Sequence, residues 1–115
     1  MIVSSVSTAS RASAAALALS FTLAPAALAR DAAAGREKAA QCAVCHGPQG
    51  LSITPDAPNL AGQPALYLGT QLRAYRSGVR RHEVMAVIAK PLSDDDIDNL
   101  SAWFSSQKIV LQTNP

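Results

Sequence analysis

The chain has 115 residues, of which 49% are hydrophobic and 16% are charged, and its formal net charge at pH 7 is only +2. This length accommodates one small domain. Because it contains no basic block and no alternation of basic with aromatic residues, the sequence does not indicate nucleic-acid binding. Its two cysteines, Cys42 and Cys45, lie close together, so no disulfide can link distant parts of the chain.

The first 29 residues are typical of an export signal. They contain one charged side chain, Arg11, which precedes an uncharged segment ending in Ala-Leu-Ala, a pattern typical of a cleavage site. We therefore expect residues 1–29 to be a secretory signal peptide cleaved before Arg30, and residues 30–115 to form the mature domain. An uncleaved membrane anchor is the alternative, but alanine and serine dominate the segment and Pro25 interrupts it.

A first helix is predicted from Asp31, a favourable N-cap, to about Cys42. It leads into Cys42-Ala43-Val44-Cys45-His46, a C-x-x-C-H motif that is the attachment signal for c-type haem. Two cysteines three residues apart share one helix face, where both thiols can form thioethers with the vinyl groups of a porphyrin. His46 can then place an imidazole nitrogen on the iron. We expect one covalently bound haem c, held by Cys42 and Cys45 and ligated by His46.

A zinc site and a thiol redox module are the other interpretations of this motif. Zinc needs further ligands, yet His82 is the only other histidine and the chain has no second cysteine pair. A thioredoxin-like motif needs a βαβ pattern around it, and no strand alternation occurs. A domain of this size usually needs a disulfide, a metal or a cofactor, and a porphyrin would serve as a large apolar core element.

Residues 47–63 are predicted to form an irregular loop. Two glycines and three prolines fall within the thirteen residues after His46, a composition that opposes regular structure. Long loops in small domains are often functional, and we expect this one to wrap one edge of the haem.

A second helix is predicted from Pro64, a favoured first-turn residue, to Gly78, which ends it. Its apolar face consists of residues spaced three and four apart: Ala65, Leu68, Leu72, Tyr75 and Val79. The other face is basic, with four arginines on it or just beyond it: Arg73, Arg76, Arg80 and Arg81. We interpret these arginines as a solvated face rather than a dedicated binding patch.

An electron-carrying haem needs a sixth ligand on its iron, and Met85 is the only methionine after the signal segment. Combined histidine and methionine ligation raises the reduction potential of a haem. The segment around Met85 is short and loop-like, which suits a ligand, so we expect Met85 to bind the iron from the connection between the second and third helices. His82 is the competing candidate, and we expect it to be an exposed loop histidine beside Arg81.

The third helix is predicted to begin after Ser93, because Asp96 lies three residues later in an arrangement related to a capping box. Acidic residues in the first turn favour the helix dipole. Its apolar stripe consists of Ile97, Leu100 and Phe104, with Trp103 beside them. We expect the helix to end near Gln107, and the short apolar tail of residues 109–111 receives no function.

Several short motifs follow one another in a fixed order along the chain. They are Gly35-Arg36-Glu37-Lys38-Ala39, the C-x-x-C-H motif with Gly47, Pro58-Asn59-Leu60-Ala61-Gly62-Gln63, the pairs Tyr67-Leu68, Gln71-Leu72 and Tyr75-Arg76, then Gly78, Met85 and Leu92-Ser93-Asp94-Asp95-Asp96-Ile97. In this order they resemble the small bacterial class I cytochromes c, in particular single-haem forms similar to one half of the two-haem periplasmic cytochromes. The resemblance covers almost all of residues 31–107.

This resemblance implies an all-α fold of about three to four helices wrapped around one haem. It also implies that the backbone carbonyl of Pro58 accepts a hydrogen bond from the second nitrogen of His46, while His46 and Met85 bind the iron. Gly35 would let the third helix approach the first closely near Trp103.

The function we expect is one-electron transfer in the periplasm, with no enzymatic turnover because both axial positions of the iron are filled. The partners would be redox proteins of a respiratory or related electron-transfer chain, met through a small, weak interface. We expect no nucleic-acid partner and no stable membrane span after signal cleavage. An electron-transfer subunit of a larger dehydrogenase or oxidase complex is the alternative, and a tight stoichiometric partner in purification would favour it.

Overall fold

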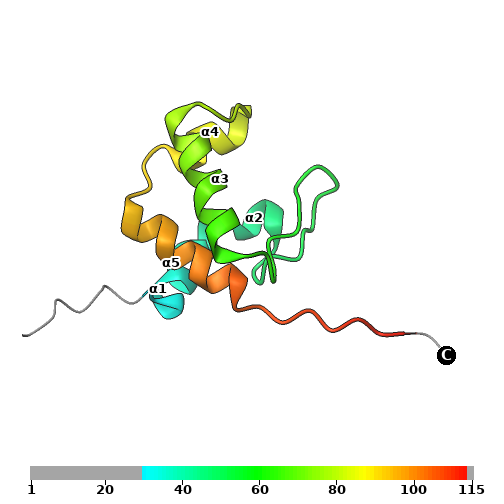
Figure 1. The fold of residues 1–115 in the computed structure, drawn as a ribbon. Helices are drawn as coiled ribbons and strands as arrows, with labels where there is room; N and C mark the ends of the chain where they lie inside the picture. The colour runs from blue at the N-terminus through cyan, green and yellow to red at the C-terminus, as the bar shows by residue number, and fades with distance from the viewer. Residues whose placement is uncertain (1–29, 114–115) are drawn as a thin grey trace, which may run out of the picture.

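The computed structural model describes residues 30–113, and the predicted signal peptide lies outside them. Within this range the chain forms five α-helices and one 3-10 helix, with no strand (Figure 1). In chain order they are α1 (Ala32–Lys38), the 3-10 helix η1 (Ala39–Gln41), α2 (Ala43–His46), α3 (Ala65–Ser77), α4 (Glu83–Ala89) and α5 (Asp94–Ser105). The predicted all-α fold is confirmed, but the expected number of three to four helices is too small.

The first predicted helix is divided into three short elements. Its predicted N-cap is confirmed, since the Asp31 carboxylate accepts hydrogen bonds from the N–H groups of Ala33 and Ala34 at 2.8 and 3.2 Å. After Lys38 the backbone tightens into η1, and Cys42 then joins η1 to α2. The C-x-x-C-H motif therefore forms a separate one-turn helix rather than the end of a long one.

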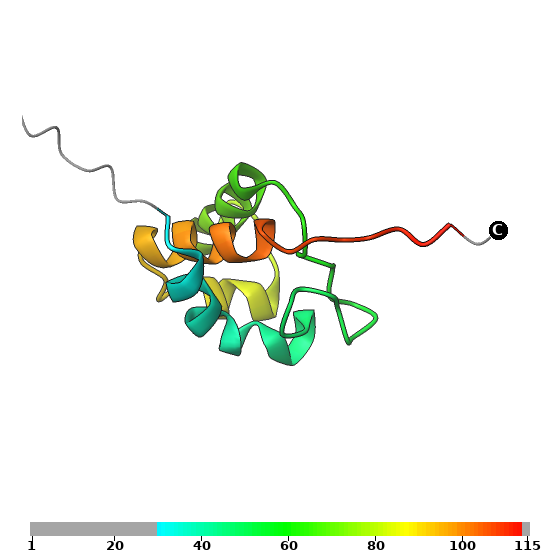
Figure 2. The ribbon, with the colours of Figure 1, turned by 90° about the horizontal axis from the view of Figure 1, so that it is seen from below.

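Helices α1 and α5 pack directly against each other, and Gly35 lies at their contact (Figure 2). A Cβ atom at Gly35 would overlap the carbonyl oxygen of Asn99 and would lie 2.9 Å from the Cβ of Trp103. The absence of a side chain thus allows the two backbones to touch. This confirms the expectation that Gly35 permits close approach near Trp103.

Replacing Gly35 by alanine is expected to destabilise the protein. Alanine favours a helix interior over glycine by about 1 kcal/mol, but here its methyl group meets backbone, which cannot turn aside as a side chain would. We expect a net loss of about 1–3 kcal/mol in the free energy of unfolding, measured by urea titration. Ala33→Gly is the control: at an exposed position of the same helix, it measures the difference in helix preference between alanine and glycine without any clash. A Gly35→Ala protein at least as stable as the wild type would contradict this packing.

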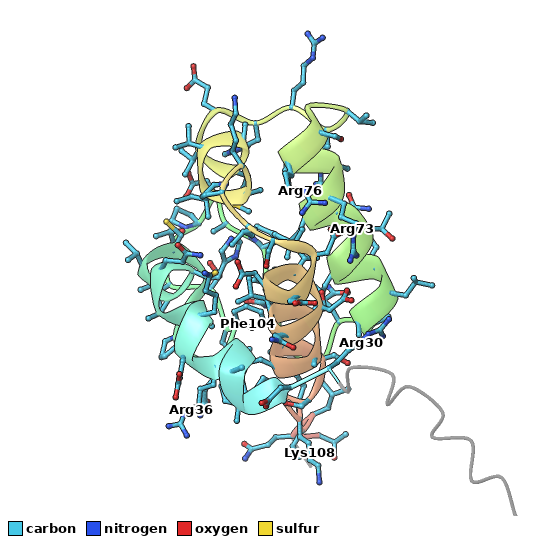
Figure 3. The ribbon with its side chains drawn as sticks, turned by 90° about the vertical axis from the view of Figure 1, so that its left-hand side faces the viewer. Arg30, Arg36, Arg73, Arg76, Phe104 and Lys108 are labelled. Atoms are coloured by element: carbon cyan, nitrogen blue, oxygen red, sulfur yellow. The ribbon has the colours of Figure 1, made fainter. Side chains whose placement is uncertain are left out.

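Two of the predicted solvated arginines instead connect α3 to α5 (Figure 3). Arg73 binds the Asp98 carboxylate at 2.9 Å, and Arg76 binds Asp94 at 2.6 Å while donating to the Leu92 carbonyl at 2.9 Å. The Arg76 guanidinium lowers the pKa of Asp94 below its ordinary value. Because Asp94 is exposed, these pairs orient the helices more than they stabilise them. The expectation of a purely solvated face is therefore wrong for these two arginines.

Helix α5 supplies most of the large buried side chains. Its start is fixed by a complete capping box, in which Ser93 and Asp96 exchange side-chain to backbone hydrogen bonds of 3.0 Å each. The bond from the Ser93 backbone is the main cause that lowers the pKa of Asp96. The predicted apolar stripe is confirmed, since three of its members are at most 3% exposed: Ile97, Leu100 and Phe104.

The remaining core is small. It comprises Ala39, Leu68, Ala89 and Leu92, which pack with the α5 stripe in one cluster. Val79, predicted on the apolar face of the second helix, lies beyond the end of α3 and is 84% exposed. The apolar tail of residues 109–111 is also exposed. Among the helices of residues 30–113, none combines the length and the apolarity that crossing a membrane requires.

Candidate haem site

The C-x-x-C-H motif closes into a single turn around one carbonyl. The N–H groups of Cys45 and His46 both donate to the carbonyl oxygen of Cys42, at 3.3 and 2.9 Å. Both cysteines are free and half-buried. Gly47 ends the turn at φ +76°, and a Cβ atom there would overlap the Leu51 carbonyl oxygen. Glycine is thus required directly after His46 for the chain to turn back under the motif.

His46 is held in one tautomer by the loop that follows it. The residue is 8% exposed, and its Nδ1 lies 2.8 Å from the carbonyl oxygen of Pro58. A carbonyl can only accept, so Nδ1 must carry the proton and donate it. This leaves the lone pair on Nε2 available for a metal, which is the usual arrangement for a ligating histidine with a carbonyl partner.

The loop is tied to the motif by polar residues that sequence reasoning missed. The carbonyl of Cys45 accepts from the Ile53 N–H at 3.2 Å, the Ser52 hydroxyl at 3.3 Å and the Thr54 hydroxyl at 3.4 Å. The N–H of Ser52 in turn donates to the Asn59 side chain at 2.7 Å. The sequence carried a signal only for the local bonds between Ser52 and Thr54, because Ser and Thr commonly form side-chain to backbone bonds with residues close in sequence.

Met85 lies in a helix, which corrects the expectation of a loop. It occupies the first turn of α4 and is half-buried. His82 is the N-cap of that helix, and its Nδ1 accepts the N–H of Met85 at 3.3 Å. The His82 ring is exposed and meets the edge of Tyr75, with the two ring centroids 6.4 Å apart. The candidate ligand and its competitor are therefore coupled, because His82 fixes the turn that carries Met85.

The environment of Cys42 does not favour a thiolate. Burial raises the pKa of its thiol to about 11, so the group stays protonated at neutral pH. Reactive cysteines of thiol redox motifs have the opposite shift. Among residues 30–113, no group of three or more His, Cys, Asp or Glu side chains is placed to hold a metal ion. The Cys42 thiol therefore lacks the lowered pKa of a reactive cysteine, and residues 30–113 hold no cluster of ligands for zinc.

The residues present fit a large apolar group. Large apolar side chains remain more than half exposed in each segment that carries a candidate site residue: Val44 in α2, Leu51 and Ile53 in the loop, and Val84 and Val87 in α4. In Figure 1, α2 and the loop lie to one side of α3 while α4 covers its upper end. A porphyrin attached at Cys42 and Cys45 would bury such side chains, and each exposed Val or Leu would gain about 1.5–3 kcal/mol on full burial.

Comparison with known proteins agrees with this geometry. The family model described as cytochrome c matches residues 32–108. Cytochrome c-554(548) of Halomonas halodenitrificans is 45% identical over 81 residues, covering 68% of this chain and 98% of that protein. The chain belongs to the cytochrome c family. This cytochrome is a c-type haem electron carrier, and the predicted class I fold and cofactor are confirmed.

Other similar proteins are longer than this cytochrome. The crystal structure of reduced cytochrome c4 from Pseudomonas stutzeri superimposes with a TM-score of 0.66 at 42% identity, over 70% of this chain and 47% of that one. A thiosulfate dehydrogenase electron acceptor of Stutzerimonas stutzeri is 41% identical over 69 residues, covering 57% of this chain and 32% of that protein. This cytochrome therefore spans less than half the length of these two relatives.

Proposed function

We propose that this protein is a periplasmic one-electron carrier in which Cys42 and Cys45 form thioethers with one haem, and His46 and Met85 are its axial ligands. The bond from His46 Nδ1 to the Pro58 carbonyl supports the proposal best, because it leaves Nε2 as the nitrogen that can bind a metal, in the residue directly after Cys45. A bound haem supplies an iron that takes up and releases one electron. The periplasmic location rests on residues 1–29, which have the composition of an export signal.

The protein would bind the haem iron, orient its ligands and keep oxygen and peroxide from reacting with it. If His46 and Met85 both bound the iron, their nitrogen and thioether would leave no coordination position for oxygen or peroxide. We therefore infer electron transfer without enzymatic turnover. The partners are redox proteins of an electron-transfer chain, which would meet the site through a small interface.

A subunit of a larger redox complex is the second candidate. It is favoured by the similarity to longer proteins, one of which is described as an electron acceptor of thiosulfate dehydrogenase. A free carrier purifies alone, whereas a subunit copurifies with one partner in fixed stoichiometry. Size-exclusion chromatography of the native protein from its source membranes and periplasm separates these two cases.

The proposed function predicts a haem-stained band at the mature mass on a denaturing gel, when the protein is made with cytochrome maturation. Covalent attachment keeps the haem on the denatured chain, whereas a merely coordinated haem is lost. A potentiometric titration of the same protein should follow a single one-electron curve. An unmodified polypeptide mass under these conditions would overturn the proposal.

A further inference from the structure

Asn59 directly follows Pro58, and each of these two neighbours accepts a hydrogen bond. The bond to Pro58 comes from the motif, and the bond to Asn59 comes from another residue of the loop. The carbonyl of Pro58 accepts from His46 Nδ1 at 2.8 Å, and the side-chain oxygen of Asn59 accepts from the Ser52 N–H at 2.7 Å. The bond between Ser52 and Asn59 is among the shortest in the loop. It spans seven residues of chain that include two prolines and no helix.

The chain at Ser52, which Asn59 holds, is itself bonded back to the motif. The Ser52 hydroxyl directs its single proton to the Thr54 carbonyl at 2.6 Å, whereas the Cys45 carbonyl accepts the N–H of Ile53, the residue after Ser52, at 3.2 Å. Because Ser52 and Ile53 are neighbours in sequence, as are Cys45 and His46, the bonds form a closed ring that runs through His46, Pro58, Asn59, Ser52, Ile53 and Cys45. Three of its links are covalent and three are hydrogen bonds of 2.7 to 3.2 Å, so the bond between Asn59 and Ser52 is one of the links that fix the position of Pro58.

The polypeptide itself covers little of Pro58. Pro58 and Asn59 are both exposed, and so are Pro55 and Asp56 before them. A carbonyl in an exposed segment keeps its direction only if hydrogen bonds on either side of it fix the backbone. The Asn59 side chain provides such a bond directly after Pro58, and the N–H groups of Leu60 and Ala61 then donate to the Gly50 carbonyl at 2.7 and 3.0 Å.

We propose that Asn59 is a positioning residue for His46, and this inference rests on the proposed function. By holding the segment at Ser52, Asn59 aims the Pro58 carbonyl at Nδ1 and so fixes the orientation and electron donation of the imidazole. A hydrogen bond from Nδ1 makes Nε2 more basic and favours the oxidised iron. Weakening that bond therefore raises the reduction potential.

The test uses the haem-loaded protein in its ferrous, diamagnetic form, in which NMR observes the His46 Nδ1 proton. Asn59→Ala should accelerate exchange of this proton with solvent at least tenfold and should raise the reduction potential. Asn99→Ala is the matched control, because the Asn99 side chain also accepts a backbone N–H, that of Asp31 at 2.8 Å, at the start of α1. The control should lower stability without moving either readout.

Asn59→Asp keeps the acceptor oxygen and should restore slow exchange of the Nδ1 proton. If the Nδ1 proton and the potential of Asn59→Ala match those of the wild type while the haem remains attached and ligated, the positioning role is wrong and the electron-carrier function stands. If Asn59→Ala does not acquire its haem, the same proposal is tested by hydrogen exchange of the wild-type protein. In low denaturant, the Ser52 N–H and His46 Nδ1 protons should exchange through one opening event with equal free energy, and unequal values overturn the proposal.

Discussion

Replacing Cys42 and Cys45 together by alanine is expected to leave the mature domain largely unfolded. The buried apolar cluster has only seven members, two of which are alanines, and Cys42 packs against it. A core of this size supplies only a few kcal/mol in a domain of fewer than 90 residues. The covalent haem would add a large apolar surface and hold α2, the loop and α4 around it. Without it, we expect the far-ultraviolet helix signal to fall by more than half, with no cooperative thermal transition.

Val44→Ala is the matched control for the double cysteine variant. Val44 lies between the two cysteines and is 73% exposed, so its truncation changes the motif without removing a thiol. This variant should retain its haem and should melt cooperatively. If the haem-free double variant instead showed a cooperative, native-like melt, the helices would not depend on the haem, and a haem-centred core would be wrong.

Replacing Met85 by alanine is expected to open the sixth coordination position of the iron. The methionine-to-iron absorption of the oxidised protein in the far red should vanish, and carbon monoxide should bind the ferrous form. Because a thioether ligand raises the potential, its loss should lower it, by on the order of 0.1 V within the roughly 0.8 V range that axial ligands span. Spectra and potentiometric titration of the same sample measure all three effects.

His82→Ala is the natural comparison, because His82 lies three residues earlier and caps the same helix. Loss of the bond between His82 Nδ1 and the Met85 N–H should destabilise the start of α4 by about 1 kcal/mol or less. The far-red absorption should remain. Its persistence in Met85→Ala, or its disappearance in His82→Ala, would show that the ligand assignment is incorrect.

Short-range patterns in the sequence determined the all-α class, the start of α1 and, within two residues, both ends of α3 and α5. Asp31 and Ser93 cap helices because their side chains reach N–H groups two or three residues later, and such bonds depend only on neighbouring residues. The stripe of Ile97, Leu100 and Phe104 followed from helical periodicity alone. The C-x-x-C-H motif indicated the cofactor because the relative positions of its two cysteines and its histidine also depend only on residues within one turn of helix.

Tertiary contacts decided the features that the sequence left undetermined. Helix α4 has seven residues, too few to be stable alone, and it forms because His82 caps it and Ala89 packs into the core. The direction of Arg73 toward Asp98 and the bond from Asn59 to Ser52 likewise depend on residues brought together by the fold. A long polar side chain has many possible partners along a sequence, and only the packed helices and the closed loop select one of them.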